Sequence, residues 1–327
     1  ITVDGKRGFI DGTGKVVIKP IYDSATEFSD GFSLVKLDGK QFFINTSGKK
    51  VLSPPKHFEV INNFTFGLAR GNITNRKTYT KAYIDTKGKV VIDNPKIWGA
   101  CEFAEGIACV VTNKWGYIDQ SGDFIIEPQF DEASYFTDGM AVVTMMVDAK
   151  ASRRKSGYID KSGRQVIPIK YDIAMRFSEG LAAVAFLESD KYTFGFLNKS
   201  GEMVIKPRFE WTHTFCGGMA AVQLRRRWGY IDRNGDLLIE PTFQKAGCFS
   251  DGLAPVAVKG KWGFINTKGE FVIQPTFTEA HAFEEGLAKV KIGGFDANAS
   301  QHDIQYDNIG KWGYIDKVGR MVWSPSN

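Results

Sequence analysis

The sequence predicts an all-β protein built as a tandem repeat array of about nine antiparallel units, and three observations lead to this prediction. The first is an aromatic phrase around a glycine that recurs along the chain, as in WGYID from Trp115, Trp228 and Trp312. The second is a spacing of 34 residues between several copies of that phrase. The third is the composition, because 25 Phe and 35 Gly among 327 residues favour strands joined by tight turns.

The aromatic phrase gives the number of units. Its glycine position falls at 8, 42, 82, 116, 157, 195, 229, 263 and 313, at intervals of 34 to 50 residues. Self-similarity at such a period is typical of repeat architectures. Phe42 and Ala82 replace the glycine in the second and third copies, so we expect the local packing to differ there.

Each unit contains three predicted strands. The first, close to EGLAAV, and the second, the WGYID phrase, alternate large and small residues with the period of a strand. A DxxG turn, such as the one from Asp11, leads into a third strand of the form VIxP; the Asp side chain bonds the turn backbone and the Gly takes a positive φ. Proline cannot donate to a ladder, so we expect it to end the third strand. No segment shows helical periodicity, so we expect no helix.

The order of the phrases predicts one domain over residues 1–327, whose first unit lacks the EGLAAV strand. Within this fold class we favour an open solenoid or superhelix of three-stranded or hairpin units. A closed β-propeller is the alternative. Nine blades exceed the usual four to eight, and a propeller sealed by pairing its ends needs the strand that the first unit lacks.

The insertions indicate a binding edge. Nearly all variation in length falls between the first and second strands of the units, and insertions in repeat arrays gather on one face, often the binding face. These loops are basic, whereas the links before the first strands are acidic. The longest insertion, over residues 291–311, carries apolar side chains that have no place in the repeat core. The candidate partner-binding residues are Arg76, Lys77, Arg153, Arg154, Lys155, Arg225, Arg226, Arg227, Phe295 and Tyr306.

The tryptophans that define the repeat have two interpretations. Trp115, Trp228, Trp262 and Trp312 hold one repeat position, with Tyr or Phe two residues later on the same strand face. In the first interpretation these aromatic side chains pack between units. In the second they are platforms on which sugars, cations or bases stack.

Composition and motifs exclude several classes of protein. A net charge of +5 is too mild to indicate a nucleic-acid binder, and no run of about 18 apolar residues predicts a membrane span. No GxSxG, HExxH or P-loop sequence occurs, so we expect no catalytic residue, no cofactor and no metal site. Cys101, Cys109, Cys216 and Cys248 form no CxxC pair; we expect small buried residues, although an even number permits disulfides.

The phrases WG, DxxG, VIxP and EGLA, which recur in order over essentially the whole chain, resemble those of the WG-repeat (KWG-repeat) family of bacteria. This resemblance implies a β-structured repeat protein without a shared catalytic residue. We expect a non-catalytic scaffold that binds a protein partner through the variable loop edge. The alternative is a ligand-binding module for a cell-wall glycan or other anionic polymer, which uses exposed aromatics and basic loops. The chain begins at Ile1 without a signal peptide, which leaves export, with an absent leader, and a cytoplasmic location open.

Overall fold

The computed structural model describes residues 1–74, 80–148, 153–293 and 310–324. Over these residues the regular structure is entirely β, as predicted, and no helix is present that could cross a membrane. Packing divides the chain into two compact units. The first comprises Ile1–Ile10 and Val16–Arg176, and the second comprises Asp11–Lys15 and Phe177–Asn327.

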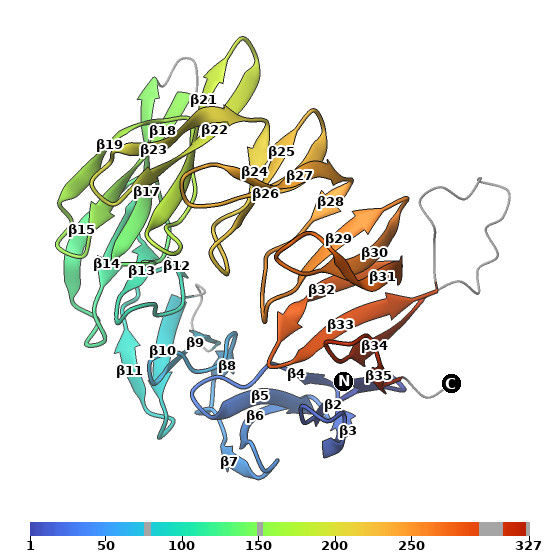
Figure 1. The fold of residues 1–327 in the computed structure, drawn as a ribbon. Coiled ribbons are helices and arrows are strands. Elements are labelled where there is room, and N and C mark those ends of the chain that lie inside the picture. Colours follow the sequence, from blue (N-terminus) through green and yellow to red (C-terminus); the bar gives the residue numbers. More distant parts are fainter. Residues whose placement is uncertain (75–79, 149–152, 294–309, 325–327) are drawn as a thin grey trace, which may run out of the picture. The chain divides into compact units, whose positions relative to one another are not determined.

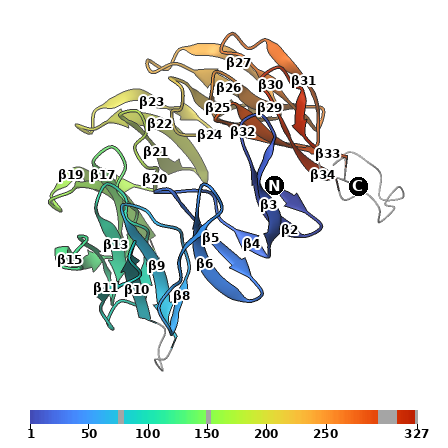
Figure 2. The same cartoon turned by 90° about the horizontal axis from the view of Figure 1, so that it is seen from below.

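The strands form nine antiparallel sheets over the described residues, and each sheet takes its strands in chain order (Figures 1 and 2). The first five sheets contain β1 (Thr2–Val3), β2 (Lys6–Ile10) and β3 (Val16–Tyr22); β4 (Ser24–Ala25), β5 (Phe32–Leu37), β6 (Lys40–Asn45) and β7 (Lys50–Leu52); β8 (Phe58–Val60), β9 (Leu68–Ile73), β10 (Thr80–Asp85) and β11 (Val90–Asp93); β12 (Gly99–Ala100), β13 (Ala108–Val111), β14 (Trp115–Ile118) and β15 (Phe124–Phe130); β16 (Glu132–Ala133), β17 (Met140–Asp148), β18 (Arg153–Asp160) and β19 (Gln165–Tyr171). The last four contain β20 (Ile173–Ala174), β21 (Leu181–Glu188), β22 (Lys191–Asn198) and β23 (Met203–Phe209); β24 (Trp211–Thr212), β25 (Ala220–Leu224), β26 (Arg227–Ile231) and β27 (Leu237–Phe243); β28 (Lys245–Ala246), β29 (Ala254–Val258), β30 (Lys261–Ile265) and β31 (Phe271–Phe277); β32 (Glu279–Glu284), β33 (Leu287–Ile292), β34 (Lys311–Ile315) and β35 (Met321–Trp323).

The favoured open solenoid is wrong, and the sheets are the blades of a β-propeller, the predicted alternative. Eight of the nine described sheets are four-stranded antiparallel meanders, which is the form of a propeller blade. Asp11–Lys15, the turn of the first sheet, belongs to the second unit, where Gly14 lies against Val322 of β35. An open array would hold this turn apart from the last repeat.

Two details of the predicted units are also wrong. Eight of the nine described repeats have an additional strand that the sequence did not reveal, such as the two-residue β4 and β24, so the predicted triplets are four-stranded sheets. The first repeat does not start at its WGYID-type strand, because a preceding strand, β1, pairs with β2 through Thr2 and Val3. The first sheet therefore has a strand before its WGYID-type strand, and the argument against a propeller, which depended on the absence of that strand, does not hold.

The glycine of the aromatic phrase is required by a close approach of two backbones. Between Trp228 and Tyr230 there is one residue, Gly229, whereas their partners Phe243 and Ile239 are separated by three. A Cβ on Gly229 would lie 2.4 Å from the Ile239 carbonyl oxygen and 2.7 Å from the Pro241 nitrogen. The proline thus sits inside a bulged strand that continues to Phe243, and the prediction that it ends the strand is wrong.

The two repeats without this glycine differ locally from the others, as the sequence predicted. Phe42 and Ala82 stand in the second and third sheets, and there the last strands, β7 and β11, have only 3 and 4 residues. In the sheets with glycine at positions 8, 116, 157, 195, 229 and 263, the last strand has 7 residues. Where a side chain holds the glycine position, the last strand thus ends before the bulge that faces the glycine in these six sheets.

We expect Gly229→Ala to lower the free energy of unfolding by about 1–3 kcal/mol, because the methyl group would force apart two paired backbones. Gly12→Ala is the matched control. Gly12 has no positive φ, and the nearest atom to its added Cβ, the Glu285 carbonyl oxygen, is 3.9 Å away. Urea denaturation of both variants measures the difference, and equal stabilities would contradict the steric role of the repeat glycine.

Acidic side chains link four of the described sheets to the sheet that follows. The Asp30 carboxylate accepts a hydrogen bond of 2.8 Å from the Gly67 N–H, and Asp251 accepts one of 2.7 Å from the Gly286 N–H. Glu105 and Glu179 bind Gly139 and Gly218 in the same way. These four residues of the predicted acidic links are therefore occupied by inter-repeat hydrogen bonds.

The Tyr of the WGYID phrase makes a second link between repeats. The buried hydroxyl of Tyr117 donates to the Ser134 carbonyl at 2.9 Å, and that of Tyr230 donates to the Gly247 carbonyl at 2.9 Å. The Tyr230 ring also packs on Phe249, with centroids 4.8 Å apart. Burial raises the pKa of both phenols well above the ordinary value. They therefore stay neutral donors at ordinary pH.

The DxxG turns have the predicted Asx chemistry. Asp11 Oδ1 accepts hydrogen bonds from the N–H groups of Thr13 at 2.9 Å and Lys15 at 3.1 Å, and Gly14 takes a φ of 85°. The hydroxyl of Thr13 also donates to Asp11, and these bonds hold the pKa of the Asp11 carboxyl below its ordinary value.

The four cysteines form two disulfides, so the expectation of unpaired buried residues is wrong. Cys101 pairs with Cys109 within the fourth sheet, and Cys216 pairs with Cys248. The second bond joins the segment before β25 to the segment before β29 and therefore connects the seventh and eighth sheets.

Candidate functional site

The structure describes six of the ten predicted partner-binding residues. Arg76, Lys77, Phe295 and Tyr306 lie outside the described residues. Arg153, Arg154 and Lys155 lie at the start of β18. The neighbours of Arg154 and Lys155 limit what these two residues can bind.

Two cations of β18 are engaged in ion pairs. Arg154 pairs with Glu132, and Lys155 pairs with Asp172 of the following repeat. The side chains of Lys155 and Asp172 are only 12% and 13% exposed. This pair recurs at the same repeat position as Lys6 with Asp23 and Lys114 with Asp131, which makes it a structural feature of the KWG phrase.

Arg225 and Arg226 form the tip of the β25–β26 hairpin. Their φ values of 49° and 61° fit a two-residue type I′ turn, which usually holds Asn-Gly. Glu210 stabilises the turn, because its two carboxylate oxygens accept hydrogen bonds from the Arg225 N–H at 3.1 Å and the Arg226 N–H at 2.8 Å. Arg227 is exposed at the start of β26.

Around this turn the chain departs from the repeat at two positions. The lysine that precedes the phrase elsewhere, as Lys6 or Lys155, is Thr193, so Glu210 faces no lysine at the paired position. The first position of β24 holds Trp211, whereas the same position in other repeats holds Ser24, Glu132, Ile173, Lys245 or Glu279.

A cavity of about 620 Å³ lies beside these two positions, within the second compact unit. We call it the Trp211 site, and it is lined by Lys191, Tyr192, Glu210, Trp211, Arg225 and Arg226.

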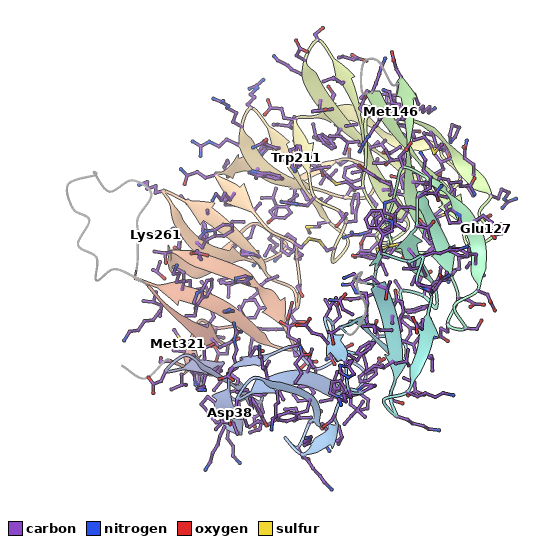
Figure 3. The ribbon with its side chains drawn as sticks, turned by 180° about the vertical axis from the view of Figure 1, so that it is seen from behind. Asp38, Glu127, Met146, Trp211, Lys261 and Met321 are labelled. Carbon is purple, nitrogen blue, oxygen red and sulfur yellow. A yellow bond between two sulfur atoms is a disulfide. The ribbon has the colours of Figure 1, made fainter. Side chains whose placement is uncertain are left out.

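Two aromatic side chains of the Trp211 site are partly exposed to solvent. Trp211, labelled in Figure 3, is 41% exposed, and Tyr192 is 42% exposed. The inner side of Trp211 rests on the fully buried ring of Phe194, with ring centroids 5.0 Å apart. A buried neighbour fixes the indole while its other side remains available to a ligand.

The electrostatics of the Trp211 site favour an anion. Three cations, Lys191, Arg225 and Arg226, stand against one carboxylate, Glu210, which gives a formal charge of 3 − 1 = +2. The Glu210 oxygens are occupied by the turn amides. Among the described residues no group of three or more His, Cys, Asp and Glu side chains is arranged to hold a metal ion.

The repeat tryptophans are partly buried. Trp115, Trp228 and Trp262 pack against hydrophobic clusters between strands. Trp228 also stacks on His213, with centroids 4.8 Å apart and an interplanar angle of 13°. Burial lowers the pKa of His213, so this imidazole is neutral at pH 7. Trp312 lies under Lys289, whose Nζ is 4.6 Å from the ring centroid.

Sequence reasoning found Arg225 and Arg226 but missed Tyr192 and Trp211. The search for aromatic platforms followed the residues that recur, whereas Trp211 occurs once at its repeat position. An alignment of the repeats with one another would have revealed Trp211, because this large aromatic residue stands where other repeats have small, aliphatic or charged residues.

Comparison with one solved structure supports the fold. A structure described as the eukaryotic initiation factor is similar with a TM-score of 0.66 at 10% identity, over 98% of this chain and 93% of that chain. A puromycin hydrolase, at 11% identity, gives a TM-score of 0.44 over 100% of this chain and 57% of that one. A prolyl endopeptidase, at 10% identity, gives 0.45 over 79% and 46%. None of the curated proteins matches the chain.

The family comparison covers more than half of the chain. The model described as "WG containing repeat" matches residues 8–40, 115–145, 157–186, 194–226, 228–262 and 262–294. These matches contain the glycines whose close contacts shape the sheets and the tyrosines that bond the next repeat. The chain therefore belongs to the WG-containing repeat family.

Proposed function

We propose that the protein is a non-catalytic binding module that takes an anionic glycan at the Trp211 site. The observation that carries this proposal is the meeting of two exposed aromatic rings with the Arg225–Arg226 turn at one cavity, at positions where the chain departs from its own repeat. A regular repeat needs none of these side chains for its packing.

The chemistry of the side chains fits such a ligand. The face of an indole or phenol ring provides a rigid apolar surface with little conformational entropy to lose, which suits the flat, C–H-rich face of a sugar ring. Guanidinium groups bind carboxylates and sulfates in a bidentate manner. A cavity of about 620 Å³ lies within the range of small-molecule sites and accommodates sugar units of a longer chain.

The same features favour a glycan over a protein partner at this site. A stable protein interface buries about 800 Å² on each partner and centres on a broad, closely packed patch. The Trp211 site instead is concave, and charged side chains border its aromatic rings. Absence of oligosaccharide binding in the test below would favour the competing function, which is capture of a protein through the loop edge.

Calorimetric titration with oligogalacturonate, an acidic oligosaccharide, and with a neutral chitooligosaccharide tests the proposal. We expect the acidic oligosaccharide to bind more tightly, and Trp211→Ala to weaken its binding by at least about tenfold, because a stacking surface worth more than about 1.4 kcal/mol is lost. Absence of binding by any acidic oligosaccharide would overturn the proposal.

A second variant tests the contribution of the arginine charges to binding while it keeps the turn intact. Arg225→Asn with Arg226→Gly removes both guanidinium groups but installs the residue pair that a type I′ turn prefers. We expect weaker binding of oligogalacturonate and a smaller dependence of its Kd on salt. Lys259→Asn is the control, because it produces the same Asn-Gly turn next to Gly260 in the eighth sheet. Equal losses in both variants would contradict a local role of the arginines.

A further inference from the structure

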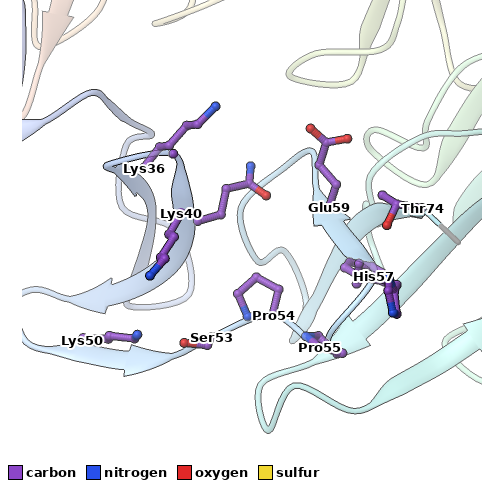
Figure 4. Close-up of a pocket in the computed structure, with 12 residues that line it drawn as sticks. Lys36, Lys40, Lys50, Ser53, Pro54, Pro55, His57, Glu59 and Thr74 are labelled. Atoms are coloured by element: carbon purple, nitrogen blue, oxygen red, sulfur yellow. The ribbon is translucent and has the colours of Figure 1, made fainter.

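A second cavity lies in the first unit, between the second and third sheets, and Figure 4 shows it in close-up. Its volume is about 450 Å³. We call it the Lys40 pocket, and its main lining residues are Lys36, Lys40, Lys50, Pro54, His57 and Glu59. None of them belongs to the Trp211 site.

The Lys40 pocket opens where the repeat is interrupted. Phe42 holds the glycine position, and β7 ends at Leu52 instead of continuing through a bulge. The chain then follows the path of Ser53, Pro54 and Pro55 along one wall of the pocket (Figure 4). From the glycine position to the next EGLA-type glycine there are 67 − 42 = 25 residues, against 31 − 8 = 23 in the first repeat. The two additional residues displace the start of the third sheet.

This displacement breaks an ion pair that recurs elsewhere. Lys40 and Glu59 hold the repeat positions of Lys6 and Asp23, whose Nζ and Oδ1 are 2.6 Å apart. No ion pair joins Lys40 to any described carboxylate. In Figure 4 the Lys40 amine and the Glu59 carboxylate point in different directions. The pocket therefore contains a lysine without its usual counter-charge.

Two further lysines from neighbouring strands border the same space. Lys36 lies near the end of β5 and Lys50 at the start of β7, and neither pairs with a carboxylate among the described residues. The Lys50 Nζ is 5.0 Å from the centroid of the Phe42 ring, so a cation–π contact positions it. Three lysines against Glu59 give a formal charge of 3 − 1 = +2.

The walls of the Lys40 pocket are fixed before a ligand arrives. The Gln41 side-chain amide donates to the Val60 carbonyl at 2.8 Å and accepts from the Val60 N–H at 3.0 Å, which connects the two sheets. The Thr74 N–H donates to the His57 carbonyl at 2.8 Å and holds His57 at a φ of 65°. A preorganised site loses less conformational entropy on binding.

From this arrangement we infer that the Lys40 pocket binds a small ligand carrying two or more phosphate groups. Ammonium groups are compact point charges that bind phosphate oxygens without a fixed orientation, and three of them around one cavity suit a ligand with several negative charges. The binding requires no metal and no covalent step. The inference does not rest on the proposed glycan site, since the residues are different.

Isothermal titration with inorganic pyrophosphate at low salt is the direct test. We expect saturable binding at one site, weakened at least about tenfold by Lys36→Gln, Lys40→Gln and Lys50→Gln combined, because most of the counter-charge is removed. The matched control combines Lys87→Gln, Lys89→Gln and Lys96→Gln, which remove the same number of exposed lysines from the first unit outside the pocket. Equal weakening in both triple variants would show attraction by net charge alone and overturn the inference.

Glu59→Gln provides a readout that misfolding cannot produce. Removing the one carboxylate of the pocket should tighten pyrophosphate binding several-fold. Unchanged or weaker binding in this variant contradicts the inference, as does the absence of pyrophosphate binding by the unmodified protein. The Arg225→Asn, Arg226→Gly variant should retain pyrophosphate binding, which distinguishes this site from the Trp211 site.

Discussion

Replacement of Cys216 and Cys248 together by serine is expected to lower the free energy of unfolding by about 3.7 kcal/mol. The bond closes a loop with a sequence separation of 32 residues, and in the chain-entropy model such a cross-link restricts the unfolded chain by about this amount. It also joins two neighbouring sheets, so its loss frees one sheet to separate from the next. Guanidinium denaturation with and without reductant measures the change.

The Cys101–Cys109 bond is the internal comparison. Its sequence separation is 8 residues, for which the same model gives about 2.5 kcal/mol. We therefore expect the Cys101→Ser, Cys109→Ser variant to lose less stability than the other double variant. The reverse order would show that the bonds act through native packing rather than through the unfolded chain.

Lys155→Met is expected to lower the free energy of unfolding by about 3 kcal/mol, because it leaves a shielded carboxylate without its cation. The partner, Asp172, is 13% exposed in its side chain, and water can replace little of the lost interaction. Chemical denaturation measures the loss, and circular dichroism establishes that the sheets still form.

Lys6→Met is the matched control for this prediction. Lys6 forms the same repeat ion pair with Asp23, but the two side chains are 44% and 37% exposed. Exposed pairs contribute little to stability because water and salt screen them. Similar losses in the two variants would indicate that burial does not decide the contribution of this repeated pair.

The strands and turns of each repeat could be predicted because their causes are local. The alternation of large and small residues in the WGYID phrase and the Asx chemistry of Asp11 act over a few residues, and the structure has the strand and the turn that they predict. The effect of Phe42 on its sheet was also predictable, since a side chain in a close backbone contact must change the pairing.

The arrangement of the repeats was not predictable in the same way. It depends on contacts such as that of Gly14 with Val322, which lie 308 residues apart (322 − 14) and leave no periodic signal. Two-residue strands such as β4 are too short to show alternation. The proline of the third strand was misjudged because the bulge that accommodates it is formed by the partner glycine.

Only part of the candidate site could be predicted, because the site also depends on contacts between segments that are separate in the sequence. Basic residues in the variable loops pointed to Arg225 and Arg226, but their neighbour Trp211 comes from a different strand, and only the fold brings it to the turn. Whether a lysine such as Lys155 is available to a partner likewise depends on Asp172, 17 residues later (172 − 155).

The hydrogen bonds between neighbouring sheets bear on how the chain folds during synthesis. The partners Tyr117 and Ser134 are 17 residues apart, and Asp30 and Gly67 are 37 apart, so each such contact can close soon after its second half leaves the ribosome. Local contacts of this kind favour rapid folding. The turn Asp11–Lys15 is the exception, because its neighbour Val322 lies about three hundred residues further along the chain. This contact can form only after all the repeats between the two segments have been synthesised.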